Sequence, residues 1–394
     1  MAPEMNVPRL RFPNFNEDWT KKCLSEIALR VTSKNKENNL NVLTISAQFG
    51  LVSQLEYFNK SVSAKDVTGY YLIHKNEFAY NKSYSNGYPM GAIKRLNKYE
   101  KGVVSTLYIC FCFNSEMVSY DFMEQYFETG LQNSEIEKFA QEGARNHGLL
   151  NIGVNDFFKI QLVLPCMAEQ TKIASFLTAL DDKLQALKKK KELLEQYKMG
   201  VMQQLFSQAL RFKKDDGTNY PDWEEKKLGE VCEIKKGQQL NKEELTESGD
   251  YPCINGGINP SGYTNMYNTK ANTITISEGG NSCGYVNFFN VKFWSGGHNY
   301  SIEISNPALV VNNYLYQLLK FNENELMKLR VGSGLPNIQK KDLVSFALNF
   351  TQSPEEQTKI ANLLSAIDEK IAHCQSELDG MERWKKGLLQ QLFC

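Results

Sequence analysis

Histidine and cysteine are the side chains of this sequence best suited to nucleophilic or metal chemistry, and their spacing favours neither. The four histidines, His74, His147, His298 and His373, are isolated from one another along the chain. The nine cysteines are odd in number and scattered, and no two of them form a Cys-x-x-Cys pair. The pattern predicts reduced thiols, without a disulfide framework, a zinc module or a Cys–His nucleophile.

Motifs for phosphate binding, methyl transfer and DNA cleavage are also absent from the sequence. No Gly-Lys dipeptide occurs, so there is no Walker-type phosphate loop. The Asn-Pro pairs at Asn259 and Asn306 continue with Ser and Ala, whereas adenine methylation needs a second proline and an aromatic residue. A Pro-Asp pair at Pro221 is nuclease-like, but Glu225–Lys227 follows it too closely for the usual second element. We therefore expect a chain that is not an enzyme, with no catalytic residues and no metal ligands.

The charges of the chain balance. Lys plus Arg and Asp plus Glu both number 45, which excludes a uniformly basic nucleic-acid coat but not local basic faces. Hydrophobic residues make up 42% of the sequence, enough for the cores of two or three domains. The sequence shows neither a signal-peptide pattern nor an apolar stretch approaching 18 residues, so we expect a cytoplasmic chain without a membrane span.

One long segment of the chain is written twice. EQTKIASFLTALDDKLQALKKKKELLEQYKMGVMQQLF begins at Glu169, and EQTKIANLLSAIDEKIAHCQSELDGMERWKKGLLQQLF begins at Glu356, an offset of 187 residues without a gap. Shorter motifs repeat in the same order: LRF at Leu10 and Leu210, DWxxKxLxE at Asp18 and Asp222, and GLxNI at Gly148 and Gly334. Each half thus has an opening motif, a long variable middle, a closing motif and a long helix. The repeat indicates two related domains rather than a solenoid.

Both copies of the long segment carry an apolar stripe at alternating spacings of four and three residues, which is typical of a coiled-coil seam. In the first copy the positions are Ile173, Leu177, Leu180, Leu184, Leu187, Lys191, Leu194, Lys198, Val201 and Leu205. In the second copy they are Ile360, Leu364, Ile367, Ile371, Cys374, Leu378, Met381, Lys385, Leu388 and Leu392. Helices of this length span about 57 Å, and the nearest partner for each stripe is the other copy. The alternative is that each helix packs only on its own domain.

The variable middles share little sequence but similar patterns. NTITIS from Asn272 alternates like a strand, and VSTLYICFCF from Val104 has the composition of a buried strand. DFMEQYFET from Asp121 and NNYLYQLLKF from Asn312 predict equivalent short helices. We expect a mixed α/β or β-rich domain in each half, and hence an α+β chain.

The ordered set of motifs resembles the specificity subunit of bacterial type I restriction-modification enzymes. The resemblance covers nearly the whole chain and rests on the two EQTKIA…QQLF helices, the two DWxxKxLxE openings and the unrelated middles between them. It implies two target recognition domains that each read half of a bipartite site in double-stranded DNA. It also implies that two long antiparallel coiled-coil helices separate these domains around a pseudo-twofold axis. The expected domains are 1–167 and 208–352, with helices over 168–207 and 353–394.

The resemblance implies partners as well. Two methyltransferase (M) subunits would bind this chain, and two restriction (R) subunits would complete the complex. Catalysis, S-adenosylmethionine, ATP and Mg would belong to those partners, so no cofactor is expected on this chain. The missing catalytic motifs agree with that division.

Polar residues on glycine-rich loops are the candidate DNA contacts, because polar side chains read base edges while Lys, Arg and backbone amides hold phosphates. In the first domain they lie in YNKSYSNGYPMGAIKRL and GARNHG: Lys82, Tyr84, Ser85, Asn86, Lys94, Arg95, Arg145, Asn146 and His147. In the second domain they are Lys235, Lys236, Asn255, Ser261, Tyr263, Asn265, Glu278, Asn281, Ser282, His298, Asn299 and Ser333. The alternative for each stretch is an ordinary solvated loop.

A different function also fits the duplication: a coiled-coil interaction scaffold with two adaptor domains and no DNA reading. Salt-dependent binding to DNA in the presence of the methyltransferase partner separates the two hypotheses.

Overall fold

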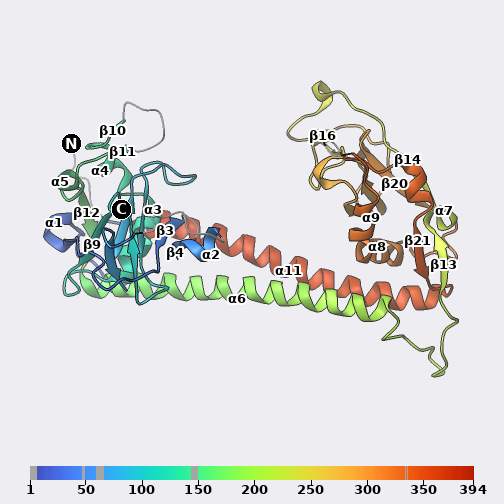
Figure 1. The fold of residues 1–394 in the computed structure, drawn as a ribbon, viewed down its shortest axis with the longest axis horizontal. Helices are drawn as coiled ribbons and strands as arrows, with labels where there is room; N and C mark the ends of the chain where they lie inside the picture. The colour runs from blue at the N-terminus through green and yellow to red at the C-terminus, as the bar shows by residue number, and fades with distance from the viewer. Residues whose placement is uncertain (1–6, 47–48, 59–65, 143–149, 333, 335) are drawn as a thin grey trace. The chain divides into compact units, whose positions relative to one another are not determined.

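The computed structural model describes residues 7–46, 49–58, 66–142, 150–332, 334 and 336–394. The chain divides into two compact units, coloured along the sequence in Figure 1. The first unit is Met1–Leu187 with Glu377–Cys394, and the second unit is Lys188–Ser376. Both long helices, α6 (Met167–Phe206) and α11 (Pro354–Leu392), contribute one part to each unit. The sequence-based boundaries, which treat each helix as a segment of its own, stay a prediction.

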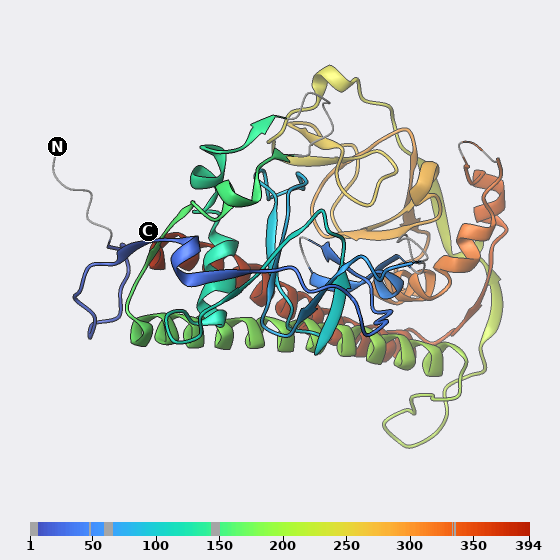
Figure 2. The same cartoon turned by 60° about the vertical axis from the view of Figure 1, so that its left-hand side comes forward.

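A four-stranded antiparallel sheet lies at the centre of the first unit. Its order is β2 (Ala28–Val31), β9 (Ile109–Phe113), β6 (Phe78–Asn81) and β7 (Ala92–Arg95). Because side chains alternate along a strand, Phe78 and Phe111 join one core with α3 (Tyr120–Thr129) and α6. Ala79 and Cys110 face the other side, towards a smaller core. Figure 2 shows these strands beside the first part of α6, in green.

The other elements of the first unit are short strands and helices around this sheet. β1 (Thr20–Cys23) pairs with β12 (Gln161–Leu164) directly before α6. The remaining elements are β3 (Leu43–Ser46), β4 (Gly50–Ser53), β5 (Tyr71–His74), β8 (Lys101–Val104), β10 (Gln141–Glu142), β11 (Leu150–Asn151), α1 (Leu24–Ile27), α2 (Gln54–Phe58), α4 (Asn133–Glu137) and α5 (Val154–Phe157).

The second unit repeats the same sheet topology. The order is β14 (Cys232–Lys236), β20 (Asn299–Ile304), β17 (Thr273–Ser277) and β18 (Val286–Phe289), again antiparallel throughout. α8 (Asn312–Phe321) is the counterpart of α3, and its Tyr314 and Leu318 are buried in the core. The strands are therefore equivalent in order although their sequences do not align.

The other elements of the second unit follow the same plan. β13 (Glu224–Lys227) pairs with β21 (Ala347–Phe350) directly before α11, as β1 pairs with β12 before α6. The remaining elements are β15 (Tyr251–Ile254), β16 (Gly262–Thr264), β19 (Trp294–Ser295), α7 (Leu228–Val231), α9 (Glu323–Lys328), α10 (Lys340–Val344) and two 3₁₀ turns, Lys242–Glu244 and Gly280–Ser282. In the described part of the chain, no helix combines the length and apolar composition needed to cross a bilayer.

The repeated motifs meet at one junction in each unit. In the second unit the Leu210 N–H donates to the carbonyl of Gln204, at 3.0 Å. In the first unit the Leu10 N–H donates to the carbonyl of Gln391, at 2.9 Å. Gln204 and Gln391 are equivalent by the 187-residue offset, so LRF meets QQLF in both units. In the first unit this contact joins the two ends of the sequence.

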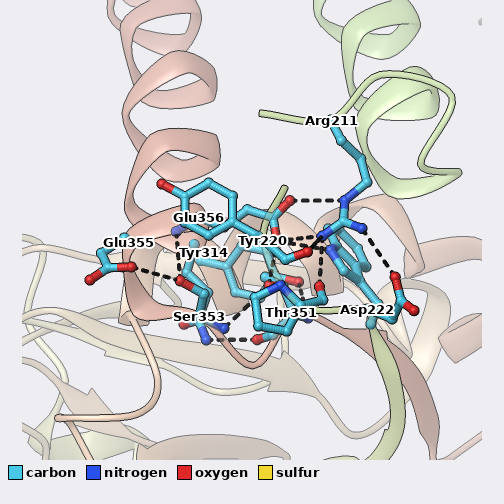
Figure 3. A network of polar contacts seen from close by, with 11 residues as sticks. Arg211, Tyr220, Asp222, Tyr314, Thr351, Ser353, Glu355 and Glu356 are labelled. Atoms are coloured by element: carbon cyan, nitrogen blue, oxygen red, sulfur yellow. Dashed lines mark hydrogen bonds and ion pairs between the residues drawn. The ribbon is translucent and has the colours of Figure 1, made fainter. Parts of the chain in front are cut away.

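A buried glutamate anchors the junction of the second unit (Figure 3). Glu356 is fully buried, and its carboxylate accepts hydrogen bonds from both Nε and Nη2 of Arg211, each at 3.2 Å. The indole N–H of Trp223 and the hydroxyl of Thr351 also donate to it, at 3.1 and 2.6 Å. The LRF motif, the DWxxKxLxE motif and the segment after β21 are thus tied to the first turn of α11.

The equivalent junction of the first unit is simpler. Glu169 accepts from Nε and Nη2 of Arg11, both at 2.8 Å. Leu164 takes the position of the threonine, and the buried Trp19 Nε1 has no hydrogen-bond partner among the described residues. Glu169, the counterpart of Glu356 in the first unit, therefore makes fewer polar contacts than Glu356 does.

The apolar stripe predicted from the sequence is the buried face of both long helices. Its buried members include Ile173, Leu177, Leu180, Leu184, Leu187, Ile360, Leu364, Ile367 and Leu378, while Ile371 is half-buried. These side chains meet both the other helix and the core of the unit, since Leu177 and Leu388 belong to one cluster with Trp19. The stripe of each helix therefore packs against the other long helix, as predicted, and also against the core of a unit, as in the alternative.

Two of the three lysines in the stripe, Lys198 and Lys385, form equivalent ion pairs between the helices. In the second unit Lys198 of α6 pairs with Asp368 of α11, at 2.7 Å. In the first unit Lys385 of α11 pairs with Asp181 of α6, at 2.5 Å. Both the lysines and the aspartates are related by the 187-residue offset. Polar residues at stripe positions specify register, so these pairs favour one antiparallel alignment of the helices within each unit. The α+β fold with two β-rich domains and two packed long helices is confirmed.

Candidate functional site

Polar residues predicted to contact DNA lie at one edge of the central sheet of the second unit, where three adjacent strands begin or end. β14 and β17 both run antiparallel to β20, so the ends of β14 and β17 meet the start of β20. The register places Lys236 opposite Tyr300 and Ser277 opposite Asn299. Glu278 follows Ser277 directly. The topology therefore brings residues from three separate sequence motifs to one edge.

Glu278 is a buried carboxylate at this edge. Its backbone N–H donates to the His298 carbonyl at 3.0 Å, and its own carbonyl accepts from the Ile338 N–H at 2.9 Å. Oε1 lies 2.7 Å from Lys236 Nζ and 3.0 Å from the Tyr300 hydroxyl. Oε2 is buried without a hydrogen-bond partner among the described residues, and His298 Nδ1 lies 3.7 Å from it. Burial, together with the bond to Glu278, raises the pKa of Tyr300, which keeps its phenol protonated.

The glycines of these loops permit close packing around Glu278. Gly256 has a positive φ of 80°, and a Cβ there would lie 2.4 Å from the His298 carbonyl oxygen. Ser277 and Ser282 both donate to the Gly256 carbonyl. The Asn255 side-chain oxygen accepts from the His298 N–H at 3.2 Å. Three loops predicted separately from the sequence are thus fixed against one another.

The remaining candidates of the second unit divide into exposed and internal side chains. Asn299 is only 1% exposed and donates to the Ser295 hydroxyl at 3.1 Å, so it holds its loop instead of facing solvent. Asn255 and Ser282 are half-buried. Lys235 is exposed and pairs with Glu303. The exposed candidates are Lys235, Lys236, Ser261, Tyr263, Asn265, Asn281 and His298.

In the first unit the candidates cluster at the turn between β6 and β7. This turn is the counterpart of the Glu278–Tyr285 segment between β17 and β18, because the two sheets have the same strand order. Tyr84 is 62% exposed and Asn86 is exposed, while Lys82 and Ser85 are half-buried. Sequence reasoning therefore selected the same structural position in both units without an alignment between them.

The two basic candidates on β7 are held inside the first unit. Lys94 is buried, pairs with Glu128, and lies 4.4 Å from the ring centroid of Tyr88. Arg95 pairs with Asp121 on α3. Burial and the neighbouring Glu128 raise the pKa of Tyr88. Both cations tie α3 to the sheet, so the exposed residues of the turn are the better candidates for DNA contacts.

Four predicted residues lie outside the described part of the chain: Arg145, Asn146, His147 and Ser333. Sequence reasoning missed three residues that contact the candidates. Tyr300 contacts Glu278, and Tyr88 and Glu128 contact Lys94. The alternation of NYSIEI would have placed Tyr300 on one face of a strand, but its partner depends on strand register. Among the described residues no group of His, Cys, Asp or Glu could hold a metal ion.

The second half of the chain matches a known family model. Residues 220–382 match the model described as the type I restriction modification DNA specificity domain. A putative type I specificity subunit of Mycoplasma pneumoniae is 34% identical over 172 residues, and one of Mycoplasma genitalium is 32% identical over 175 residues. Each alignment covers 44% of this chain, and 46% and 45% of the two relatives, so the chain spans about half the length of these relatives.

Two further matches extend over more of the chain. The type I restriction enzyme MjaVIII specificity subunit of Methanocaldococcus jannaschii is 26% identical over 295 residues, which is 65% of this chain and 66% of that protein. The crystal structure of a type I restriction-modification S subunit from M. genitalium has the same fold, with a TM-score of 0.66, 20% identity, and coverage of 98% of this chain and 99% of that one. Together these matches place a type I restriction modification DNA specificity domain at residues 220–382, and they show that the chain is similar to type I specificity subunits over about two thirds of its length and shares the fold of one over nearly all of it.

Proposed function

We propose that each unit reads one half of a bipartite target in double-stranded DNA, and that the chain directs adenine methylation or restriction by partner subunits. The observation that carries this proposal is the repeated sheet. Both units have the same strand order, and the same inter-strand segment in each carries polar residues of different chemistry. Equivalent positions with different side chains fit two readers of two different base sequences.

The exposed residues define the contacts within this proposal. In the first unit Tyr84 and Asn86 face solvent at the β6–β7 turn, and in the second unit Asn281 and His298 do so near Glu278. Exposed lysines such as Lys235 supply phosphate contacts, which position the protein without reading sequence. The zero net charge of the chain requires such cations to act locally.

Two copies of one partner fit the repeated helices. Tyr197 on α6 and Trp384 on α11 occupy equivalent positions by the 187-residue offset. Both are aromatic and exposed, at 58% and 52% of their surface. Exposed aromatic residues are typical anchors of protein interfaces, and equivalent anchors accept equivalent subunits. The proposed partners are two M subunits on these surfaces, with two R subunits in the full complex and the catalytic cofactors on those partners.

Sequencing of methylated bases tests the proposal. A strain that expresses this chain with its M subunit should carry methylated adenines in one bipartite motif, and removal of this chain alone should abolish that methylation. Binding of the purified complex to the motif should weaken with salt, with a log–log slope of about −0.9 for each phosphate neutralised. Unchanged methylation without this chain, or binding that salt does not affect, would support the scaffold hypothesis instead.

A further inference from the structure

Glu278 holds an acceptor that the protein leaves unused. Its side chain is 11% exposed, and Oε2 has no hydrogen-bond partner among the described residues. A buried polar atom without a partner is costly, and such atoms concentrate at sites that meet a ligand. His298 Nδ1, at 3.7 Å, is beyond hydrogen-bond distance of Oε2.

The other half of the carboxylate is firmly placed. Lys236 Nζ can only donate, and it lies 2.7 Å from Oε1. The Tyr300 hydroxyl lies 3.0 Å from the same oxygen. The Glu278 backbone is bonded on both sides, to His298 and to Ile338. Oε1 therefore faces the protein, and Oε2 remains the atom for an incoming group.

This arrangement determines which kind of ligand group can bind Oε2. Oε2 needs a hydrogen-bond donor, and Lys236 already offsets the negative charge, so a neutral donor fits better than a cation. The neutral donors on base edges in the major groove are the exocyclic amines, cytosine N4 and adenine N6. The His298 side chain is 66% exposed, and the hydrogen bonds of this residue to Asn255 and Glu278 use its backbone N–H and carbonyl. Rotation of this side chain can therefore open a path to Oε2 without moving the loop.

We propose that Glu278 Oε2 reads one base of the half-site bound by the second unit, by accepting a hydrogen bond from the exocyclic amine of cytosine or adenine. Lys236 and Tyr300 are positioning residues that hold the opposite oxygen. This inference rests on the proposed function. It adds the chemical class of base at one position, which the family resemblance does not supply.

The substitution Glu278→Gln tests the proposal sharply. Because Lys236 can only donate, the glutamine carbonyl must take the place of Oε1, and the NH₂ group then takes the place of Oε2. The free atom changes from an acceptor to a donor. We expect one position of one half-site to change from an amino base, A or C, to a keto base, G or T, with a preference of at least about tenfold. Sequencing of methylated sites in cells that carry the assembled enzyme gives the result.

Glu303→Gln is the matched control, because Glu303 also pairs with a lysine of β14 but lies exposed on β20. It should leave the motif unchanged. An unchanged motif in Glu278→Gln, or changes at several positions, would overturn the proposal. If the Glu278→Gln enzyme methylates nothing, the Glu278→Asp variant tests the proposal instead, because aspartate keeps a carboxylate. Methylation of sites with the original base at that position supports the proposal. A different base at that position, or no methylation, contradicts it. Absence of any motif with the natural chain would instead defeat the proposed function itself.

Discussion

Replacing Glu356 with alanine is expected to lower the free energy of unfolding of the second unit by about 3–5 kcal/mol. The carboxylate accepts from Arg211, Trp223 and Thr351, and its removal leaves all three donors without their acceptor. Most of this cost comes from the indole N–H of Trp223, which loses its acceptor, and from Arg211, which loses its buried counter-charge and keeps only the Tyr220 and Pro221 carbonyls and the exposed Asp222. Hydrogen exchange of the amides in β14, β17 and β20 should accelerate by about two to four orders of magnitude.

Glu355→Ala is the control for this substitution, since it removes the neighbouring carboxylate from the same helix turn. Glu355 is exposed, and its carboxylate accepts a hydrogen bond from the Ser353 hydroxyl, at 3.1 Å. Its loss should change the free energy of unfolding by no more than about 0.5 kcal/mol. Equal effects of the two variants would show that the network in Figure 3 does not stabilise the junction.

Phe393→Ala should have a comparable effect on the first unit, at about 3–5 kcal/mol. Phe393 follows the last residue of α11, is 5% exposed, and packs its ring against Trp19, Phe122 and Tyr126 at centroid distances of 6.3, 5.3 and 5.9 Å. Truncation of this side chain leaves a cavity in the core of the first unit. Hydrogen exchange should accelerate in β2, β6 and β9, while the strands of the second unit keep their protection.

Trp384→Ala serves as the matched control for Phe393→Ala. It removes a larger aromatic side chain from α11 in the same unit, but Trp384 is 52% exposed. Its loss should cost less than about 1 kcal/mol. If Phe393→Ala leaves the first unit as stable as Trp384→Ala does, the C-terminal residues are not part of its core.

The parts of the fold that depend on local periodicity were predictable from the sequence. The repeated seam predicted two long helices, which are α6 and α11, because its spacing is a local signal. The helices expected at Asp121 and Asn312 are α3 and α8. The expected strand from Val104 was partly wrong, since β8 ends at Val104 and β9 begins at Ile109. The Tyr108 N–H donates to the Ser105 carbonyl, and this turn separates the two strands.

Contacts between distant segments were not predictable in the same way. The ion pairs of Lys198 and Lys385 depend on the antiparallel register of the two helices, and nothing local in the sequence specifies it. The candidate site shows the same limit. Composition selected the candidate loops, but burial of Lys94 and Asn299 depends on how strands pair. The free oxygen of Glu278 is likewise visible only once Lys236 and Tyr300 lie beside it.

Replacement of residues 28–147 tests the two-reader account most directly. The replacement would be the equivalent middle of another specificity subunit whose DNA target differs, with the opening motif, closing motif and both long helices retained. Methylated sites of a strain carrying this hybrid and its M subunit would be sequenced. The account predicts that one half of the bipartite motif changes and that the other half stays as it was. A simultaneous change of both halves, or of neither, would contradict it.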